Sequence, residues 1–239
     1  MNNINNFDTM NNTIHQLYGK YINDPQYVYK SCGDYVVIMR LLEDTKTNLN
    51  RNDITDPTNA KYRADKIYTE LIFNKYDPNK TILSISNTFY KSKVTYTVNS
   101  ITYPDKFDND LNKFYTNGIH FFKSIEQALL WDLNLIDCSY TGRYIRYYEC
   151  GKIYSICNYT DGKKCGDFIR YNRNGTVDEK RNYINNKQMY GEIFMYDYYG
   201  SIDYCSSITF KKWIYCNNKK SNVKTCNNFF KENIKCNLL

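Results

Sequence analysis

Three pairs of glycines in the second half of the chain fall on one period, and this repeat constrains the fold more than any other feature. The glycines of each pair are nine positions apart, and successive pairs are 24 and then 25 residues apart. A tyrosine keeps its place within each pair. The repeat-defining residues are Gly142, Tyr147 and Gly151, then Gly166, Tyr171 and Gly175, then Gly191, Tyr196 and Gly200. Such self-similarity is typical of a stacked array whose single unit cannot bury its own apolar face.

The residues between the repeat copies indicate hairpin turns. Asp161-Gly162 and Asn185-Asn186 occupy equivalent positions, 24 residues apart. Both dipeptides tolerate positive φ, which a tight two-residue hairpin turn requires. Each repeat is therefore expected to be a β-hairpin, and successive hairpins should lie side by side in one antiparallel sheet. The recurring tyrosines would form a ladder on one face, which we interpret as core packing in preference to a ligand platform.

The first half of the chain mixes strand and helix signals. Residues 27–42 are expected to form a strand, and residues 81–86 and 93–98 alternate apolar and polar side chains as half-buried strands do. A further strand at 118–122 leads into a helix. Ser124 begins a capping-box pattern that the glutamine three residues later completes.

These patterns predict a mainly β protein of the α+β class. An N-terminal α+β domain is followed by stacked antiparallel hairpin repeats that form an extended sheet, closed by a C-terminal capping helix. The expected divisions are a loosely ordered N-terminal segment (1–25), the α+β domain (26–139), the hairpin repeats (140–210) and a basic tail or cap (211–239).

The C-terminal segment carries most of the net charge. Residues 211–239 hold seven lysines and one acid, so they contribute +6 of the total +7. Apolar residues at 226, 230, 234 and 238 have the spacing of one helix face, and the lysines then form its solvated side. The same lysines are candidates for contact with nucleic acid or an anionic membrane surface, although the segment lacks the arginines that bind phosphate bidentately. These candidates are Lys211, Lys212, Lys219, Lys220 and Lys224.

Several function classes find no support in the sequence. No apolar run is long enough to span a membrane, and the polar N-terminus lacks the features of a secretory signal. The nine cysteines form no C-x-x-C pair and only two histidines are present, so we expect reduced thiols and no metal site. No catalytic triad, P-loop or dinucleotide fingerprint is present, and no cofactor is expected.

The repeat unit that starts at Gly166 resembles the MORN-variant (YwqK-type) repeat, which pairs a mid-strand tyrosine with a turn glycine and a short aliphatic strand. The copies that start at Gly142 and Gly191 match the same pattern. This resemblance implies stacked hairpins. It also implies a role in protein scaffolding, or in attachment to a membrane surface, and no established enzymatic activity.

The first half resembles a domain of unknown function that is common in giant DNA viruses of the mimivirus group. The resemblance spans residues 28–135, and its matching segments are 61–66, 107–108 and 118–128. Tyr62 and Tyr115 stand where that domain is expected to carry cysteines, so any thiol-based role is lost here. The resemblance implies a viral protein located in the host cytoplasm or in the virion.

The leading hypothesis is a non-enzymatic interaction or scaffolding protein, whose repeats present an extended surface to a viral or host protein. An enzymatic alternative comes from residues 118–128, which resemble the strand and helix of ADP-ribosyltransferase folds. That resemblance implies a pocket in which His120 contacts nicotinamide, Tyr115 or Phe122 stacks, and Glu126 is the polar partner. We favour the first hypothesis because a histidine between the core residues of a strand is more often structural.

Overall fold

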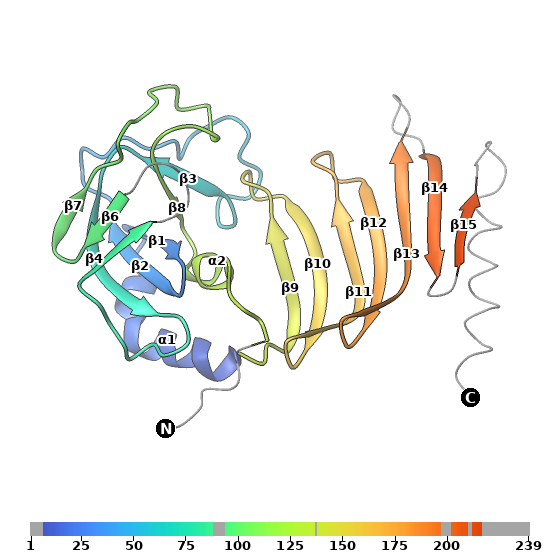
Figure 1. The fold of residues 1–239 in the computed structure, drawn as a ribbon. Coiled ribbons are helices and arrows are strands. Elements are labelled where there is room, and N and C mark those ends of the chain that lie inside the picture. Colours follow the sequence, from blue (N-terminus) through green and yellow to red (C-terminus); the bar gives the residue numbers. More distant parts are fainter. Residues whose placement is uncertain (1–6, 88–93, 137, 197–201, 210–211, 217–239) are drawn as a thin grey trace. The chain divides into compact units, whose positions relative to one another are not determined.

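The computed structural model describes residues 7–87, 94–136, 138–196, 202–209 and 212–216, which belong to two compact units (Figure 1). The first unit comprises Met1–Gly142 with two short pieces, Arg146–Ile153 and Thr160–Gly162. The second comprises Arg143–Ile145, Tyr154–Tyr159 and the chain from Lys163 onward. The turn that joins the first two strands of the repeat region is therefore counted with the first unit.

The first unit is built on a six-stranded antiparallel sheet with the strand order β3-β8-β1-β2-β4-β7. Two further strands, β5 (Ser84–Asn87) and β6 (Val94–Thr97), lie within the segments predicted as strands from their alternating pattern, and they pair with each other. The strands of the main sheet are β1 (Tyr27–Cys32), β2 (Tyr35–Arg40), β3 (Lys61–Ala64), β4 (Ile67–Asn74), β7 (Ser100–Thr102) and β8 (Ile119–Phe122).

The single strand predicted over 27–42 is instead a hairpin. β1 and β2 pair along their whole length, and Cys32 lies opposite Tyr35 across a two-residue turn. Gly33 in this turn has a φ of 56°, a left-handed conformation that glycine adopts without steric cost. Gly33-Asp34 is itself a turn signal, but the prediction joined the apolar residues on both sides of it into one strand.

The N-terminal segment predicted to be loosely ordered forms helix α1 (Phe7–Ile22). Its buried residues, Phe7, Met10, Ile14 and Tyr18, are three or four positions apart and therefore share one face. The Tyr18 ring stacks on Phe73 of β4 with 4.6 Å between ring centroids, and its hydroxyl donates to the Pro78 carbonyl. The prediction was wrong because asparagines and threonines separate the apolar residues and lower the average hydropathy of the segment.

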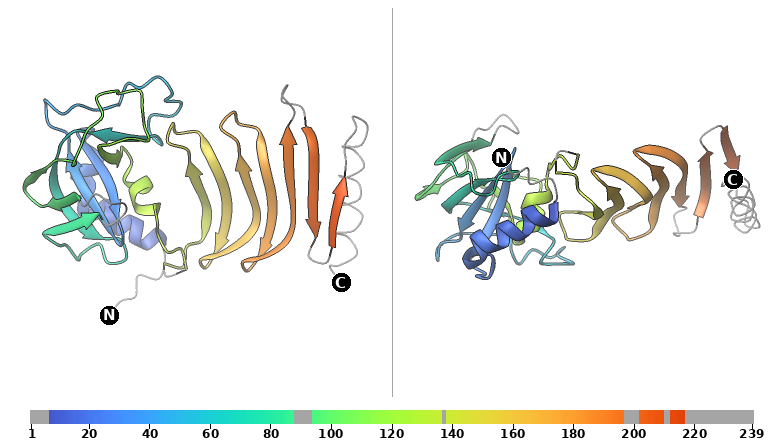
Figure 2. Two further views of the ribbon diagram at one scale, coloured as in Figure 1. Left: turned by 45° about the horizontal axis from the view of Figure 1, so that its top comes forward. Right: turned by 90° about the horizontal axis from the view of Figure 1, so that it is seen from below.

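The two faces of the six-stranded sheet are covered differently. One face carries the main hydrophobic core, whose members include Val28, Val37, Met39, Ile72, Ile119 and Phe121. The other face is covered by α1, through the stacking of Tyr18, and by helix α2 (Ile125–Leu130), which packs on β1, β2 and β8 (Figure 2). Both faces of this sheet are therefore buried.

Ser124 caps helix α2 as predicted. The Gln127 N–H donates to Ser124 Oγ at 3.3 Å. The Gln127 side chain does not complete a capping box, because its Nε2 donates to Asn59 Oδ1 at 3.1 Å. The helix ends at Leu130, and its C-cap residue Trp131 has an extended backbone.

The second sheet contains seven strands in the order β15-β14-β13-β12-β11-β10-β9, so each strand pairs with the next along the chain. The turn conformations agree with the hairpin prediction: φ is 47° at Asp161, 73° at Gly162, 49° at Asn185 and 67° at Asn186. The strands are β9 (Gly142–Tyr147), β10 (Ile153–Thr160), β11 (Lys163–Tyr171), β12 (Val177–Ile184), β13 (Lys187–Tyr196), β14 (Ile202–Thr209) and β15 (Lys212–Cys216).

The sheet extends one strand beyond the predicted boundary at residue 210, because β15 pairs with β14 in an antiparallel register. The predicted capping helix lies outside the described residues, as do Gly200 and four of the candidate lysines, Lys211, Lys219, Lys220 and Lys224. Lys212 is the first residue of β15. Within the described part of the chain, no helix has the length and apolar character needed to cross a membrane.

Candidate functional site

Arg63 organises the part of the first unit in which the sequence suggested a pocket. This fully buried residue lies on β3 opposite His120 of β8. Its guanidinium donates to the carbonyl oxygens of Lys113 at 2.7 Å and Asp108 at 2.6 Å, and also to those of Asp110 and Asn117. Four carbonyls of one irregular loop therefore converge on a single side chain, which fixes the loop against the sheet.

His120 is bound to the same loop. Its Nε2 lies 3.2 Å from the Phe114 carbonyl oxygen, and its ring meets the Phe114 ring edge-on with 5.0 Å between centroids. Burial lowers the pKa of His120 to about 4, although the bond to the Phe114 carbonyl opposes that shift. The imidazole is therefore neutral at pH 7, and a neutral ring donates to the carbonyl through Nε2–H. This arrangement suits a structural histidine.

The other three residues of the predicted pocket each have a partner of their own. Tyr115 is exposed, and its hydroxyl donates to the Glu149 carboxylate at 2.9 Å. The buried Phe122 ring packs against Trp131 with 5.5 Å between centroids. Glu126 accepts from Ser124 Oγ at 2.7 Å and pairs with His15 Nε2 at 3.2 Å. The nicotinamide pocket remains a prediction, and these bonds do not favour it.

The second sheet carries a repeated aromatic pair that the sequence analysis missed. Tyr144 of β9 meets Tyr159 of β10 edge-to-face, with 5.9 Å between ring centroids and an interplanar angle of 88°. Phe168 of β11 meets Tyr183 of β12 at 6.4 Å and the same angle. Each member lies 24 residues after its counterpart, so the pairs follow the period of the glycines. Applying that period to the aromatic residues would have found them.

Cations surround the second aromatic pair. Lys164 Nζ lies 5.7 Å from the centre of the Phe168 ring and 5.1 Å from that of Tyr183. The Arg181 guanidinium lies 5.8 Å from the Phe168 ring centre, and Arg181 Nη1 donates to Tyr183 Oη at 3.1 Å. Because Phe168 is paired directly with Arg181 across the two strands, these side chains share one face of the sheet.

Two carboxylates on β12 are held by arginines. Glu179, only 2% exposed, forms an ion pair of 3.1 Å with Arg170 Nη1 and accepts a hydrogen bond from Arg181 Nε. Asp178 accepts from Arg170 Nε at 2.5 Å. These bonds fix the orientations of both arginines, so the cationic groups beside the aromatic pair are held in place on the strands. We call Lys164, Phe168, Arg170, Arg181 and Tyr183 the aromatic–cationic face.

The strands beneath this face lie in one layer (Figures 1 and 2). No residue of β11 is buried, and β12 buries only Glu179 and Tyr183. On the opposite face of the same two strands, Asn182 Nδ2 donates to Asp167 Oδ1 at 2.9 Å. Both faces of β11 and β12 therefore remain partly open to solvent, in contrast to the covered sheet of the first unit.

The repeat-defining tyrosines are not members of these aromatic pairs. Tyr147 ends β9 and Tyr171 ends β11, and both are partly exposed. The side chain of Tyr196 lies outside the described residues, so the predicted ladder remains a prediction. The glycines Gly151 and Gly175 have φ values of 90° and 89°, as their predicted turn role requires.

Comparison with known families assigns a domain to the first unit only. Residues 15–128 match the model of a family of unknown function, DUF5758. No curated protein matches the chain. The match begins inside α1, before the start at residue 28 expected from sequence, so this helix is part of the domain. Among the described residues, no group of three or more His, Cys, Asp or Glu is placed to hold a metal ion.

Proposed function

We propose that the protein is a non-catalytic interaction module, in which the hairpin sheet binds an acidic protein partner through its aromatic–cationic face. The observation that carries this proposal is the recurrence of edge-to-face aromatic pairs at the repeat period, with lysine and arginine beside the second pair on a partly open sheet. The finer assignment, a MORN-like scaffold of a giant virus in the host cytoplasm or virion, rests on the sequence resemblance.

The residue types of this face are those that supply binding energy at protein interfaces. Tyrosine and arginine are enriched among the residues that dominate interface energetics. An aromatic side chain held on a strand loses little conformational entropy when it is covered by a partner. Arg170 and Arg181 are already oriented by Asp178 and Glu179, which lowers the ordering cost further.

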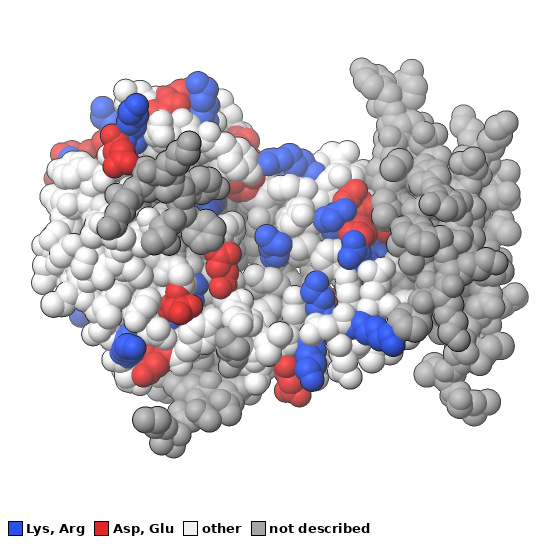
Figure 3. All heavy atoms as spheres, in the orientation of Figure 1, with Lys and Arg blue, Asp and Glu red and all other residues white. Residues whose placement is uncertain are grey.

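Charge favours an acidic partner. The two carboxylates on this face already pair with arginines, whereas Lys164 forms no ion pair with any residue that the structure describes. Lysines and arginines also outnumber acids over β9–β12 on the side shown in Figure 3. A partner that brings carboxylates to Lys164 would gain an ion pair and would cover the Phe168 and Tyr183 rings.

The test is affinity capture with the full chain, followed by a binding measurement on each protein captured. The test variant combines Lys164→Glu with Phe168→Ala, and the matched control on the opposite face is Asn182→Ala. Loss of hot-spot contacts typically costs about 2 kcal/mol or more, which corresponds to about a thirty-fold rise in Kd. We expect that rise for an acidic protein partner and a change of less than about two-fold for the control.

Two outcomes would contradict the proposal. The first is a protein partner whose Kd is the same for the wild type and the face variant. The second is capture of nucleic acid or lipid alone, released as salt rises, because that result would assign binding to the C-terminal lysines.

A further inference from the structure

A second site lies in the first unit, where β3, β8 and the end of α2 meet. Lys61 is the first residue of β3 and is paired directly with Phe122 of β8. Its Nζ lies 4.0 Å from the centre of the Trp131 ring and 5.2 Å from that of Phe122. Trp131 as a residue is 38% exposed, so a ligand can approach it from solvent.

The Lys61 backbone is firmly held, whereas its amine is not. The backbone N–H donates to the Glu149 carbonyl at 3.0 Å, and the backbone carbonyl accepts from Arg51 Nη1 at 2.6 Å. The ammonium group donates no hydrogen bond to any residue that the structure describes. Lys61 is partly exposed, so small solutes can reach its side chain. The position is therefore rigid, and the nitrogen is left available to react.

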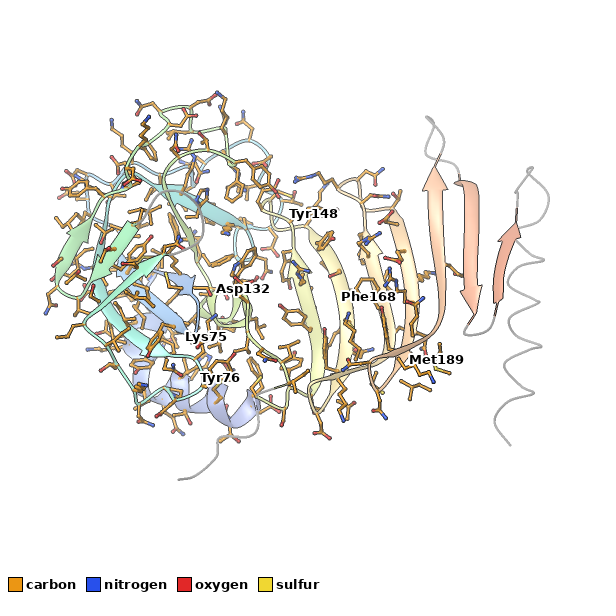
Figure 4. The ribbon with its side chains drawn as sticks, viewed as in Figure 1. Lys75, Tyr76, Asp132, Tyr148, Phe168 and Met189 are labelled. Atoms are coloured by element: carbon orange, nitrogen blue, oxygen red, sulfur yellow. The ribbon has the colours of Figure 1, made fainter. Side chains whose placement is uncertain are left out.

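Two other lysines of the first unit differ from Lys61, because the ammonium group of each donates hydrogen bonds. Lys75 is the first. Its side chain is fully buried, and its Nζ donates to Ser31 Oγ at 2.7 Å and to the Trp131 carbonyl at 2.6 Å. Lys30 is also buried, and its Nζ donates to the His120 carbonyl at 3.0 Å. Lys75 and Asp132 are labelled beside α2 in Figure 4.

Burial lowers the pKa of Lys61 to about 8, and the nearby Lys30 charge lowers it further, while Asp132 opposes the shift. The charged or titratable groups that act on this amine thus come from β1, from the loop after α2 and, through His120, from β8. With such a pKa, roughly one fifth of the amine is neutral near pH 7.4, far more than for a free lysine. A desolvated lysine beside another cation is the setting in which amines act as nucleophiles.

We propose that Lys61 is a nucleophilic amine that condenses with the carbonyl group of a small, flat, negatively charged aldehyde or ketone stacked on Trp131. The neutral Nζ attacks the carbonyl carbon and forms a C–N bond. The resulting carbinolamine loses its oxygen as water, with both hydrogens of the amine leaving in that water, and a C=N bond remains. No oxidant or reductant is needed. The nearby Lys30 ammonium group favours the negative charge on the ligand.

The inference is independent of the proposed binding role of the second unit, because it concerns residues of the first unit only. Lys61 also lies at the start of the 61–66 segment that the sequence analysis singled out. A charged residue in that segment is expected to be solvated. Its position between two aromatic rings was not predictable from sequence, since Trp131 is distant along the chain.

The test uses pyridoxal 5′-phosphate, a flat aldehyde with a negatively charged group, as the probe. The full chain is incubated with a substoichiometric amount, reduced with borohydride and mapped by peptide mass spectrometry. We expect Lys61 to be labelled at least ten-fold faster than Lys123, an exposed lysine that follows Phe122 directly in the sequence. The labelling rate of Lys61 should rise with a midpoint near pH 8.

Variants separate a reactive site from ordinary surface labelling. Lys61→Arg should abolish the fast labelling, Lys123→Arg should leave it unchanged, and Trp131→Leu should slow it while circular dichroism reports an intact fold. Equal labelling of Lys61 and Lys123 would overturn the proposal, as would preferential labelling of Lys75. A Lys61 labelling rate that keeps rising through pH 10 would overturn it too.

Discussion

The two units of the protein handle buried charge in different ways. In the first unit, Arg63 is fully buried and is satisfied by backbone carbonyls of an irregular loop. In the second, Arg181 is bound by the Glu179 carboxylate and a tyrosine hydroxyl, and it remains partly exposed. The difference follows from the architecture, because the first sheet is covered on both faces and the second lies in one layer. Charge in the first unit therefore organises the fold, whereas the paired charges of the second unit remain partly exposed to solvent.

Substitution of Arg63 should produce the largest effect and would test that comparison most directly. Arg63→Ala leaves four carbonyls of the loop without their donor, and an unsatisfied buried group costs about 1–3 kcal/mol. We expect the first unit to lose more than about 3 kcal/mol of unfolding free energy, or to fail to fold. Urea unfolding of a Trp213→Phe background, followed by Trp131 fluorescence, would measure the loss.

Arg40→Ala is the matched control for Arg63. Arg40 also lies in the first unit, but it pairs with Glu70 at 2.7 Å with both side chains partly exposed. Such a pair contributes about 1 kcal/mol or less. Similar losses for the two variants would show that the loop does not depend on the buried guanidinium.

Gly151 and Gly175 sharpen the comparison, because they hold equivalent positions in successive repeats and lie in different units. Both have φ near 90°, so alanine is strained at either site. A Cβ at Gly151 would also lie 2.2 Å from the Asp56 carbonyl oxygen, whereas one at Gly175 meets nothing within 4 Å. We expect Gly175→Ala to cost about 1–2 kcal/mol and Gly151→Ala clearly more.

Thermal unfolding of the two glycine variants would decide the matter. Equal shifts in Tm would mean that the turn at Gly151 moves freely away from Asp56. That result would remove the close packing of the first repeat turn on the first unit's own loop.

Helix α1 offers a third test, since the sequence analysis expected no order there. Ile14 is fully buried and Leu17 is 43% exposed on the same helix. Ile14→Ala should cost about 2–4 kcal/mol by leaving a cavity, and Leu17→Ala less than about 1 kcal/mol. Urea denaturation of both variants gives the comparison. Equal, small effects would show that α1 does not stabilise the first unit.

Structural features that depend on a few adjacent residues could be predicted from the sequence. The hairpin turns at Asp161-Gly162 and Asn185-Asn186 were predicted because the turn conformation depends on two residues. Ser124 was predicted as a helix cap for the same reason. The turn at Gly33 was missed, although Gly33-Asp34 is a local turn signal, because the apolar residues on both sides were assigned to one strand.

The hydrogen bonds that bind the buried Arg63 guanidinium could not be predicted from sequence, because their acceptors are distant along the chain. The carbonyls that receive Arg63 lie 45 to 54 residues away from it. An arginine in a strand is normally read as a surface residue, and no neighbouring residue signals otherwise. The aromatic pairs were missed for another reason. The repeat was defined by the glycines and by the tyrosines within each glycine pair, and these do not include Phe168 or Tyr183.

The pH dependence of stability gives the smallest expected effect and tests the covered character of the first unit. The folded pKa of His120 is about 4, below the unfolded value of about 6.5. The unfolded chain therefore binds more protons between these values, so the stabilising contribution is fully present above pH 6.5 and is lost as pH falls toward 4. The maximum loss is about 3 kcal/mol, and about 2 kcal/mol is expected at pH 5.

The unfolding free energy, measured at pH 7 and at pH 5, should show this dependence on pH in the wild type, and His120→Gln should reduce it. His15→Gln changes an exposed residue of α1 and should leave the dependence on pH unchanged. If the His120→Gln variant keeps the wild-type dependence of unfolding free energy on pH, other groups cause that dependence. The loop that contacts His120 would then admit water.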